Sequence, residues 1–247
     1  MKISKIELVE IDVLILVGGQ GKRLRSVSRG TPKPLVKING KPFLTNLIKH
    51  LKTFGFKRII LCTGYKAEYF ERFVASSNNR DLKIVISHEE TPLGTGGAIR
   101  NAKGEITSDV FLVLNGDTFC ELDYKEFYCE YVQRQALAQI AVNETKSFVN
   151  YGMVELDDNE RIIGFSEKPE NVSCNRVFLN AGIYLFNKKV FELIPKGIPL
   201  SLEKDIMPEI VAQFEPFVYA FVTPSNFIDI GTPENYRKAL HIIKVDE

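Results

Sequence analysis

The chain has 247 residues, of which 45% are hydrophobic and 26% charged, and its formal net charge at pH 7 is +1. This balance excludes the strongly basic composition of a protein whose main partner is nucleic acid or an anionic membrane surface. The longest apolar runs have the length of strands, far below the roughly 20 residues of a membrane-spanning helix. Residues 1–12 lack the apolar core of a signal peptide.

The cysteines indicate a reducing compartment. Cys62, Cys120, Cys129 and Cys174 show no C-x-x-C spacing, and some of them lie within apolar runs. We therefore expect reduced structural thiols in a cytoplasmic protein, and neither a disulfide framework nor a zinc site.

The first predicted element is a buried strand over residues 13–17, VLILV, and it ends in Gly18-Gly19-Gln20-Gly21. An unbroken apolar run of this length is typical of a parallel strand buried on both faces. Glycines let the backbone approach a bulky anion, and successive N–H groups can cradle phosphate. Lys22, Arg23 and Lys33 follow and supply positive charge. This stretch predicts a nucleotide phosphate site, whereas a lone tight turn would not need the basic residues.

Two common glycine motifs do not fit this stretch. The P-loop requires Ser or Thr after Gly-Lys, but Arg23 follows Gly21-Lys22. The dinucleotide motif G-x-G-x-x-G/A starts at Gly19 and fails at Leu24.

The next elements alternate between strand and helix. We expect a small hairpin over 37–42, a helix from Phe43 to a stop at Gly55, a strand over 58–63, a helix over 67–74 and a strand over 83–87. This order predicts βαβ units with a parallel sheet. A fourth buried strand over 110–114 ends in Asn115-Gly116-Asp117. A carboxylate at that point can hold phosphate-bound Mg²⁺, although Asp also suits a plain turn.

Beyond Leu137 the pattern changes, because fewer helices intervene. Strands are predicted over 138–142, 152–156, 161–165, 177–186 and 217–222, with a helix over 201–213. The sheet should therefore acquire antiparallel strands in this half. Thr232 as N-cap and Pro233 at the first helical position predict a last helix that runs to about Lys244.

The motifs together resemble one family. GGQGKRL followed by Pro32-Lys33-Pro34-Leu35 is similar to the G-G-x-G-x-R-L…P-K-P signature of sugar-1-phosphate nucleotidylyltransferases, and the similarity continues through nearly the whole chain. It implies a Rossmann-like α/β nucleotidyltransferase fold, with a mixed, mostly parallel twisted sheet flanked by helices and a small antiparallel sugar-binding lobe. It also implies a single domain over residues 1–247, with a nucleotide-binding part over about 11–135 and a sugar-binding part over about 136–247.

The resemblance also implies roles for individual residues in the reaction NTP + sugar 1-phosphate → NDP-sugar + pyrophosphate. The catalytic residues would be Arg23, Lys33 and Lys168; Gly18, Gly19, Gly21 and Lys22 would hold the nucleotide; Gly152, Glu167, Lys168 and Asn180 would bind the sugar phosphate; and Asp117 and Asp229 would bind Mg²⁺. The sugar-phosphate set rests on the motifs Y-G, E-K-P and N-x-G-I-Y around Gly152, Glu167 and Asn180.

The stretch from His88 to Ile99 resembles the family's base-recognition loop and includes Glu89, Gly94 and Thr95. Uridylyl and thymidylyl relatives carry Gln where Glu89 stands, whereas the guanylyl branch shows an E-E-x-P-L-G-T run. A carboxylate only accepts hydrogen bonds, and guanine presents two adjacent N–H donors. We therefore expect GTP as the nucleotide. Glu90 is an alternative partner for the base, and both residues could instead form a solvated pair.

The short chain looks most like D-glycero-D-manno-heptose 1-phosphate guanylyltransferases, and then like mannose-1-phosphate guanylyltransferases. Uridylyl or thymidylyl transfer is a further alternative. A non-catalytic relative is less consistent with the retained Arg23, Lys33, Asp117 and Asp229, and a molybdenum-cofactor guanylyltransferase or glycosyltransferase is less consistent with the E-K-P and N-x-G-I-Y motifs. The expected partners are small-molecule substrates, with no nucleic acid and no membrane, and a homodimer is compatible with the resemblance.

Overall fold

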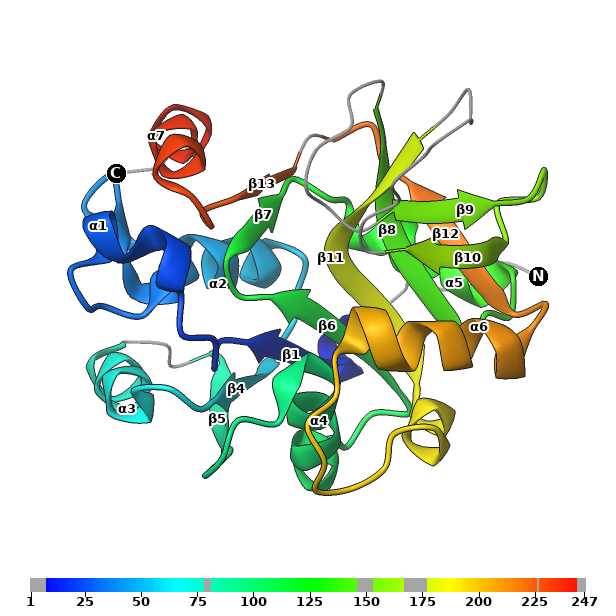
Figure 1. The fold of residues 1–247 in the computed structure, drawn as a ribbon, viewed down its shortest axis with the longest axis horizontal. Coiled ribbons are helices and arrows are strands. Elements are labelled where there is room, and N and C mark those ends of the chain that lie inside the picture. The colour runs from blue at the N-terminus through cyan, green and yellow to red at the C-terminus, as the bar shows by residue number, and fades with distance from the viewer. Residues whose placement is uncertain (1–7, 78–80, 146–152, 167–176, 226, 244–247) are drawn as a thin grey trace.

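The computed structural model describes residues 8–77, 81–145, 153–166, 177–225 and 227–243. A nine-stranded mixed sheet lies at its centre (Figure 1), with the path β10-β9-β11-β6-β1-β4-β5 and with β8 and β12 attached through β11. The strands of this sheet are β1 (Asp12–Leu16), β4 (Arg58–Thr63), β5 (Lys83–His88), β6 (Val110–Asn115), β8 (Ala138–Thr145), β9 (Met153–Leu156), β10 (Ile162–Ser166), β11 (Val177–Asn187) and β12 (Val218–Val222).

The first half of the sheet is parallel. β1 pairs with β4 on one side and with β6 on the other, and β4 pairs with β5, all in parallel. Parallel neighbours need crossover connections, and three helices supply them in turn: α2 (Phe43–Thr53), α3 (Ala67–Ser76) and α4 (Gly94–Asn101). All four strands therefore end at the same edge of the sheet, and the loops that follow them can meet there.

Helices cover both faces of this sheet. Val13 and Ile15 of β1 face a core that includes α2, α5 (Tyr124–Gln133) and α7 (Pro233–Ile242). Leu14 faces the opposite core, which includes α4 and α6 (Met207–Phe214). Figure 1 shows α2 and α4 on opposite sides of β1. The predicted mixed α/β fold with flanking helices is thus confirmed. The helices are α1 (Arg25–Ser28), α2 (Phe43–Thr53), α3 (Ala67–Ser76), α4 (Gly94–Asn101), α5 (Tyr124–Gln133), α6 (Met207–Phe214) and α7 (Pro233–Ile242).

The second half of the sheet contains the predicted antiparallel strands. β11 pairs antiparallel with β6, β8 and β9, and β9 pairs antiparallel with β10. In this half of the described chain, β12 pairs in parallel, with β8. The eleven residues of β11 serve both halves, because residues 183–187 pair with β6 while residues 178–179 pair with β9.

Some elements differ from the sequence-based expectation. The helix predicted over 201–213 begins with a π-helical turn, Leu202–Ile206, before α6. The hairpin over 37–42 is confirmed as β2 (Lys37–Ile38) and β3 (Lys41–Pro42), but the ribbon of β7 (Thr118–Cys120) and β13 (Phe227–Asp229) was not predicted. Short 3₁₀ turns lie at Leu8–Glu10, Lys22–Leu24, Lys33–Leu35, Ala102–Glu105 and Lys188–Glu192. Among the described residues, no helix has the length and apolar character needed to cross a membrane.

Candidate active site

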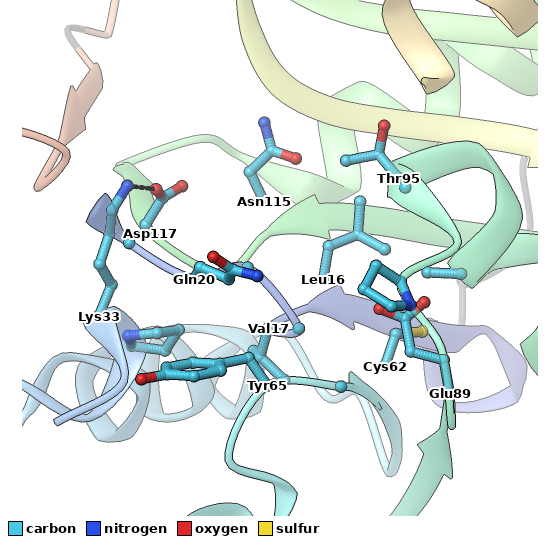
Figure 2. A pocket seen from close by; sticks show the side chains of 18 of the residues that line it. Leu16, Val17, Gln20, Lys33, Cys62, Tyr65, Glu89, Thr95, Asn115 and Asp117 are labelled. Carbon is cyan, nitrogen blue, oxygen red and sulfur yellow. Dashed lines mark hydrogen bonds and ion pairs between the residues drawn. The ribbon is translucent and has the colours of Figure 1, made fainter. Parts of the chain in front are cut away.

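The loops after β1, β4, β5 and β6 surround one cavity of about 700 Å³ (Figure 2). Figure 2 shows Glu89 at one end of the cavity and the Lys33–Asp117 pair at the other, with Val17 and Gln20 between them. The cavity is lined by Leu16, Val17, Gly18, Gly19, Gln20, Gly21, Lys33, Pro34, Cys62, Gly64, Tyr65, His88, Glu89, Glu90, Pro92, Gly94, Thr95, Ala98, Asn115, Asp117 and Glu203. The arrangement places an acidic end at Glu89 and an ion pair at the opposite end, separated by a glycine loop.

Glu89 is held in place by the strands beneath it. Its backbone N–H donates to the carbonyl of Thr63, at 2.9 Å, and its Oε2 accepts from the backbone N–H of Leu93, at 3.2 Å. Its Oε1 lies against Gly64, where an added Cβ would come within 2.5 Å of that oxygen. Only a glycine at position 64 therefore leaves room for this carboxylate.

The environment of Glu89 favours the neutral form of its carboxyl. Burial raises the pKa of the Glu89 carboxyl, and the Leu93 N–H and His88 lower it only partly. Among the described residues, no donor reaches Oε1. Both Glu89 and Glu90 line the cavity, but Glu89 is half-buried and Glu90 is exposed. This difference favours Glu89 as the residue that reads a ligand.

The glycine loop runs between the two ends of the cavity. Gly18, Gly19 and Gly21 all line it, as the sequence predicts for a nucleotide-binding loop. Within the described part of the chain, no acceptor takes the backbone N–H groups of residues 19–21. These groups are therefore available to an anion in the cavity. Lys22 and Arg23 are exposed and do not line the cavity.

At the end opposite Glu89, Lys33 Nζ lies 2.6 Å from Asp117 Oδ2. Asp117 follows β6 in the turn to β7, and Lys33 begins a 3₁₀ turn after the signature loop. The Lys33 side chain is only 13% exposed, so this ion pair is partly shielded from water. The sequence singled out both residues but did not predict their pairing. Lys33, a candidate phosphate ligand, and Asp117, a candidate metal ligand, thus neutralise each other's charge in this pair.

The unpredicted ribbon of β7 and β13 brings the second predicted metal ligand alongside the first. Asp229 pairs with Thr118, and the backbone N–H of Ile230 donates to the carbonyl of Asp117, at 2.9 Å. A Cβ on Gly231 would lie 2.3 Å from Asp229 Oδ1 and 3.5 Å from an Arg23 side-chain nitrogen, so Arg23 and Asp229 are near neighbours.

The Asp229 carboxylate is oriented by the start of α7. Its Oδ1 accepts from the backbone N–H of Gly231, at 2.6 Å, and its Oδ2 accepts from Asn235 Nδ2, at 3.1 Å. Among the described residues, no group of three metal-ligating side chains forms. A cation here would therefore take Asp117 and Asp229 as hard oxygen ligands and complete its shell with phosphate and water. The donor set fits Mg²⁺ in that role.

The predicted sugar site is described only in part. Gly152, Glu167 and Lys168 lie outside the described residues, and Asn180 lies in β11. Asn180 Oδ1 accepts from the backbone N–H of Gly182, at 2.9 Å, and its Nδ2 donates to the Tyr184 hydroxyl, at 2.7 Å. Asn180 is adjacent to the cavity through Tyr184 and Glu203, although it is not a lining residue itself.

Several residues that line the cavity were missed, and Glu203 is the one with most side-chain hydrogen bonds in the described part of the chain. Its Oε2 accepts from the hydroxyls of Thr95 and Ser201, and its Oε1 accepts from that of Tyr184. Thr95 stands in the first turn of α4, next to Gly94, so Glu203 joins the loop of predicted nucleotide ligands to β11. The only signal for Glu203 in the sequence is its place as an acidic residue in the run L-E-K-D-I-M-P, and this run alone predicts no role for it.

Comparisons with known proteins identify the family of this chain. The model of a family described as nucleotidyl transferase matches residues 12–244. A D-glycero-alpha-D-manno-heptose 1-phosphate guanylyltransferase of Aneurinibacillus thermoaerophilus is 37% identical over 229 residues, which are 93% of this chain and 96% of that protein. A mannose-1-phosphate guanylyltransferase of Mycobacterium tuberculosis is 34% identical over 230 residues, 92% of this chain, but the chain spans only 63% of that relative. The crystal structure of HddC from Yersinia pseudotuberculosis complexed with GMP-PN matches with a TM-score of 0.82 at 41% identity, over 95% of this chain and 100% of that one.

Proposed function

The chain belongs to the nucleotidyl transferase family, and from this premise we propose that it transfers a guanylyl group from GTP to a sugar 1-phosphate and releases pyrophosphate. The observation that carries the proposal is the polarity of the cavity, which has a partly buried carboxylate at one end and the Lys33–Asp117 pair at the other. A nucleoside triphosphate has a matching polarity, with base N–H groups at one end and phosphates at the other.

The acidic end is suited to guanine. Glu89 Oε2 already accepts from Leu93, which leaves Oε1 and the remaining lone pairs for a ligand. Guanine offers two adjacent N–H donors to such a carboxylate. Uracil and thymine place an acceptor beside their single N–H, and adenine has an acceptor at N1. A partly buried carboxylate facing those bases would be left desolvated and unpaired, and such a mismatch discriminates strongly. The GMP-PN complex of the Yersinia relative supports the same base.

The proposed sugar is D-glycero-D-manno-heptose 1-phosphate. The support comes from the Aneurinibacillus relative, which the chain matches over nearly its full length. Mannose 1-phosphate is the second candidate, because the Mycobacterium relative of that name is similarly identical over the shared part. The predicted ligands Glu167 and Lys168 would orient the sugar phosphate. The product would be a nucleotide-sugar for glycan biosynthesis.

The reaction is an in-line displacement at the α-phosphorus. An oxygen of the sugar phosphate forms a bond to that phosphorus, the bond to the oxygen of the β-phosphate breaks, and pyrophosphate leaves with that electron pair. The protein contributes mainly position and charge. Lys33 would move from Asp117 onto the α-phosphate, where negative charge develops. Arg23 would hold the departing phosphates, and the backbone N–H groups of residues 19–21 would cradle the triphosphate.

We propose Mg²⁺ as the cofactor. Asp117 and Asp229 would hold the cation, which when bound neutralises phosphate charge and draws electron density from the reacting phosphate oxygens. The chain prepares these ligands in two ways. The start of α7 orients Asp229, and Lys33 compensates the charge of Asp117 until substrates arrive. The three described cysteines are unpaired, which supports the cytoplasm as the place of the reaction.

A substrate matrix tests the proposal. Pyrophosphate release is measured for GTP, UTP, dTTP, CTP and ATP, each with heptose 1-phosphate, mannose 1-phosphate and glucose 1-phosphate, with Mg²⁺ and with excess EDTA. We expect the highest kcat/KM for GTP with the heptose substrate, and no turnover in EDTA. A preference for UTP or dTTP would overturn the role of Glu89, and full activity in EDTA would overturn the two-aspartate metal site. Turnover with mannose 1-phosphate alone would favour the second sugar.

A further inference from the structure

A continuous chain of hydrogen bonds connects the predicted sugar ligand Asn180 to the start of α4. Asn180 Nδ2 lies 2.7 Å from the Tyr184 hydroxyl, and that hydroxyl lies 3.2 Å from Glu203 Oε1. The other carboxylate oxygen, Oε2, accepts from the Thr95 hydroxyl, at 3.1 Å. Thr95 in turn accepts from the backbone N–H of Leu202, at 2.7 Å. Four side chains from β11, the π-helical turn and α4 thus share one network.

The direction of every bond in this chain is determined. A carboxylate only accepts, so the Tyr184 hydroxyl must donate its single proton to Glu203. Burial and the nearby Glu203 charge raise the pKa of Tyr184 well above its usual value, so the hydroxyl keeps that proton. Its lone pairs can then only accept from Asn180, which must present Nδ2. The other side of the amide agrees, because the Gly182 N–H is a donor and needs Oδ1.

The backbone brings these residues together in an unusual way. In a regular strand the side chains of residues 180 and 184 share a face but stand two repeats apart. The pairing of β11 with β8 is irregular between Asn180 and Tyr184, and Gly182 has a φ of +70°. A Cβ on Gly182 would come within 2.5 Å of the Asn115 side chain. The bulge therefore shortens the strand until the two side chains touch, and the π-helical turn directs Glu203 at the same point.

We propose that Glu203 is a positioning residue that fixes, through Tyr184, the orientation of the Asn180 amide toward the sugar substrate. The proposal rests on the sugar-binding role of Asn180 within the proposed function. With Glu203 as acceptor, Asn180 keeps one N–H of Nδ2 and one lone pair of Oδ1 for the sugar hydroxyls, in a single orientation. Without the Glu203 carboxylate, the Tyr184 hydroxyl could donate to Asn180, and the Asn180 amide would then turn over to present Oδ1 to it. The NH₂ group of the turned amide would face the Gly182 N–H, which is also a donor.

A polarity-reversal cycle tests the network without any substrate. Asn180→Asp alone puts a carboxylate, which can only accept, opposite the Tyr184 hydroxyl. The only proton of that hydroxyl already goes to Glu203, so the free energy of unfolding should fall. Glu203→Gln added to Asn180→Asp lets the chain run in reverse: the new amide at position 203 donates to the Tyr184 hydroxyl, which donates to the new carboxylate at position 180. The double variant should recover most of the lost stability in urea unfolding.

Repulsion between two carboxylates would also produce such a recovery. The cycle is therefore repeated with Tyr184→Phe, where the relay is gone and the recovery should vanish. Additive losses, or a recovery that persists with Phe at position 184, would overturn the proposal.

Kinetics supply the second measurement, with whichever sugar 1-phosphate the wild type uses. Tyr184→Phe should raise the KM for the sugar phosphate by roughly two- to tenfold, the equivalent of one hydrogen bond, with a smaller change in the KM for GTP. Ser201→Ala is the matched control, because it removes another hydroxyl donor to Glu203, together with the N-cap of the turn that carries Glu203, but leaves the Asn180–Tyr184–Glu203 bonds in place. It should leave the sugar KM unchanged. Equal effects of the two variants would contradict the positioning role. If the wild type turns over no sugar phosphate, the proposed function fails, and the stability cycle still decides the network.

Discussion

At the scale of single residues, Glu89 meets two opposed requirements. Its burial beside Gly18 and Gly64 is unfavourable for a charge in the empty site, as its raised pKa indicates. In the proposed function, the same burial would let the carboxylate select a base, because water could not replace a mismatched partner. The half-buried carboxylate therefore lowers the free energy of unfolding, and in the proposed function it would gain discrimination between bases.

Glu89→Gln should separate these two effects. A carboxyl with a raised folded-state pKa holds its proton longer in the folded chain than in the unfolded chain. Its contribution to stability therefore falls as pH rises from the ordinary range of glutamate to the raised value. At pH 7 the ligand-free variant should be more stable than the wild type, and the difference should shrink on acidification. Urea unfolding over a pH series measures this.

The same substitution should reduce the preference for GTP over UTP and dTTP by on the order of a hundredfold, because an amide can donate as well as accept. Glu90→Gln is the matched control, since Glu90 is the exposed neighbour with the same charge. It should keep both the stability profile and the base preference of the wild type. The reverse outcome, with Glu90→Gln losing the preference, would assign base recognition to Glu90.

The proposed Mg²⁺ would compete with Lys33 for the Asp117 carboxylate, since Lys33 Nζ lies 2.6 Å from Asp117 Oδ2. Lys33→Ala should therefore bind Mg²⁺ more tightly than the wild type when no nucleotide is present, in isothermal titration. Its kcat should nevertheless fall by on the order of a hundredfold or more, because the charge that develops at the phosphate loses a partner. Unchanged Mg²⁺ affinity would show that the ion pair does not shield Asp117.

At the scale of elements, the strands were predictable because long apolar runs leave few alternatives. The runs 58–63 and 110–114 became β4 and β6 with almost the predicted bounds, and the N-cap at Thr232 is confirmed. Helix α5 was missed although Tyr124, Phe127 and Tyr131 show helical spacing and Asp123 caps it. The ribbon of β7 and β13 could not be predicted from local pattern. Its strands have three residues each, and their pairing joins segments more than 100 positions apart.

The candidate site shows the same difference between local patterns, which a sequence reveals, and contacts between distant segments, which it does not. Residues within one motif, such as Gly18 to Gly21 and Glu89, could be singled out from the sequence because local pattern and the family resemblance mark them, and they line the cavity. The Lys33–Asp117 pair and the contact of Glu203 with Thr95 join segments that lie 84 and 108 positions apart. No spacing rule within a sequence encodes such a contact, because the fold creates it.

The N-caps of two helices allow a paired test of whether the start of α7 orients Asp229. Thr232 accepts from the backbone N–H of Asn235, and Asn235 holds Asp229. Asp123 caps α5, which does not line the cavity. Thr232→Ala and Asp123→Ala should each lower the free energy of unfolding by about 1 kcal/mol. Only Thr232→Ala should raise the Mg²⁺ concentration needed for half-maximal activity. A similar increase for both would mean that the metal requirement follows global stability and not the orientation of Asp229.

At the scale of the whole molecule, β11 joins the two halves that the sequence predicts as nucleotide-binding and sugar-binding parts. Its last residues pair with β6 and its first residues with β9, while β8 pairs with residues of both parts. One hydrophobic core contains Val13 and Ile15 from the first half together with Ile183 and Phe221 from the second. Neither half can unfold alone without exposing that core and the edge of β6.

We therefore expect the described parts of both halves to unfold in one transition and to gain equal stability from a ligand that contacts only one of them. GTP with Mg²⁺, at 100 times the dissociation constant, should raise the free energy of unfolding by about 2.7 kcal/mol. Hydrogen exchange measured by mass spectrometry can read this gain separately in peptides over β6 and over β12, which lies at the far side of β8 from β11. The gain should be the same in both peptides under conditions where exchange requires global unfolding. Protection that rises over β6 while β12 exchanges at its ligand-free rate would show that the second half opens independently, and that the prediction of one domain is wrong.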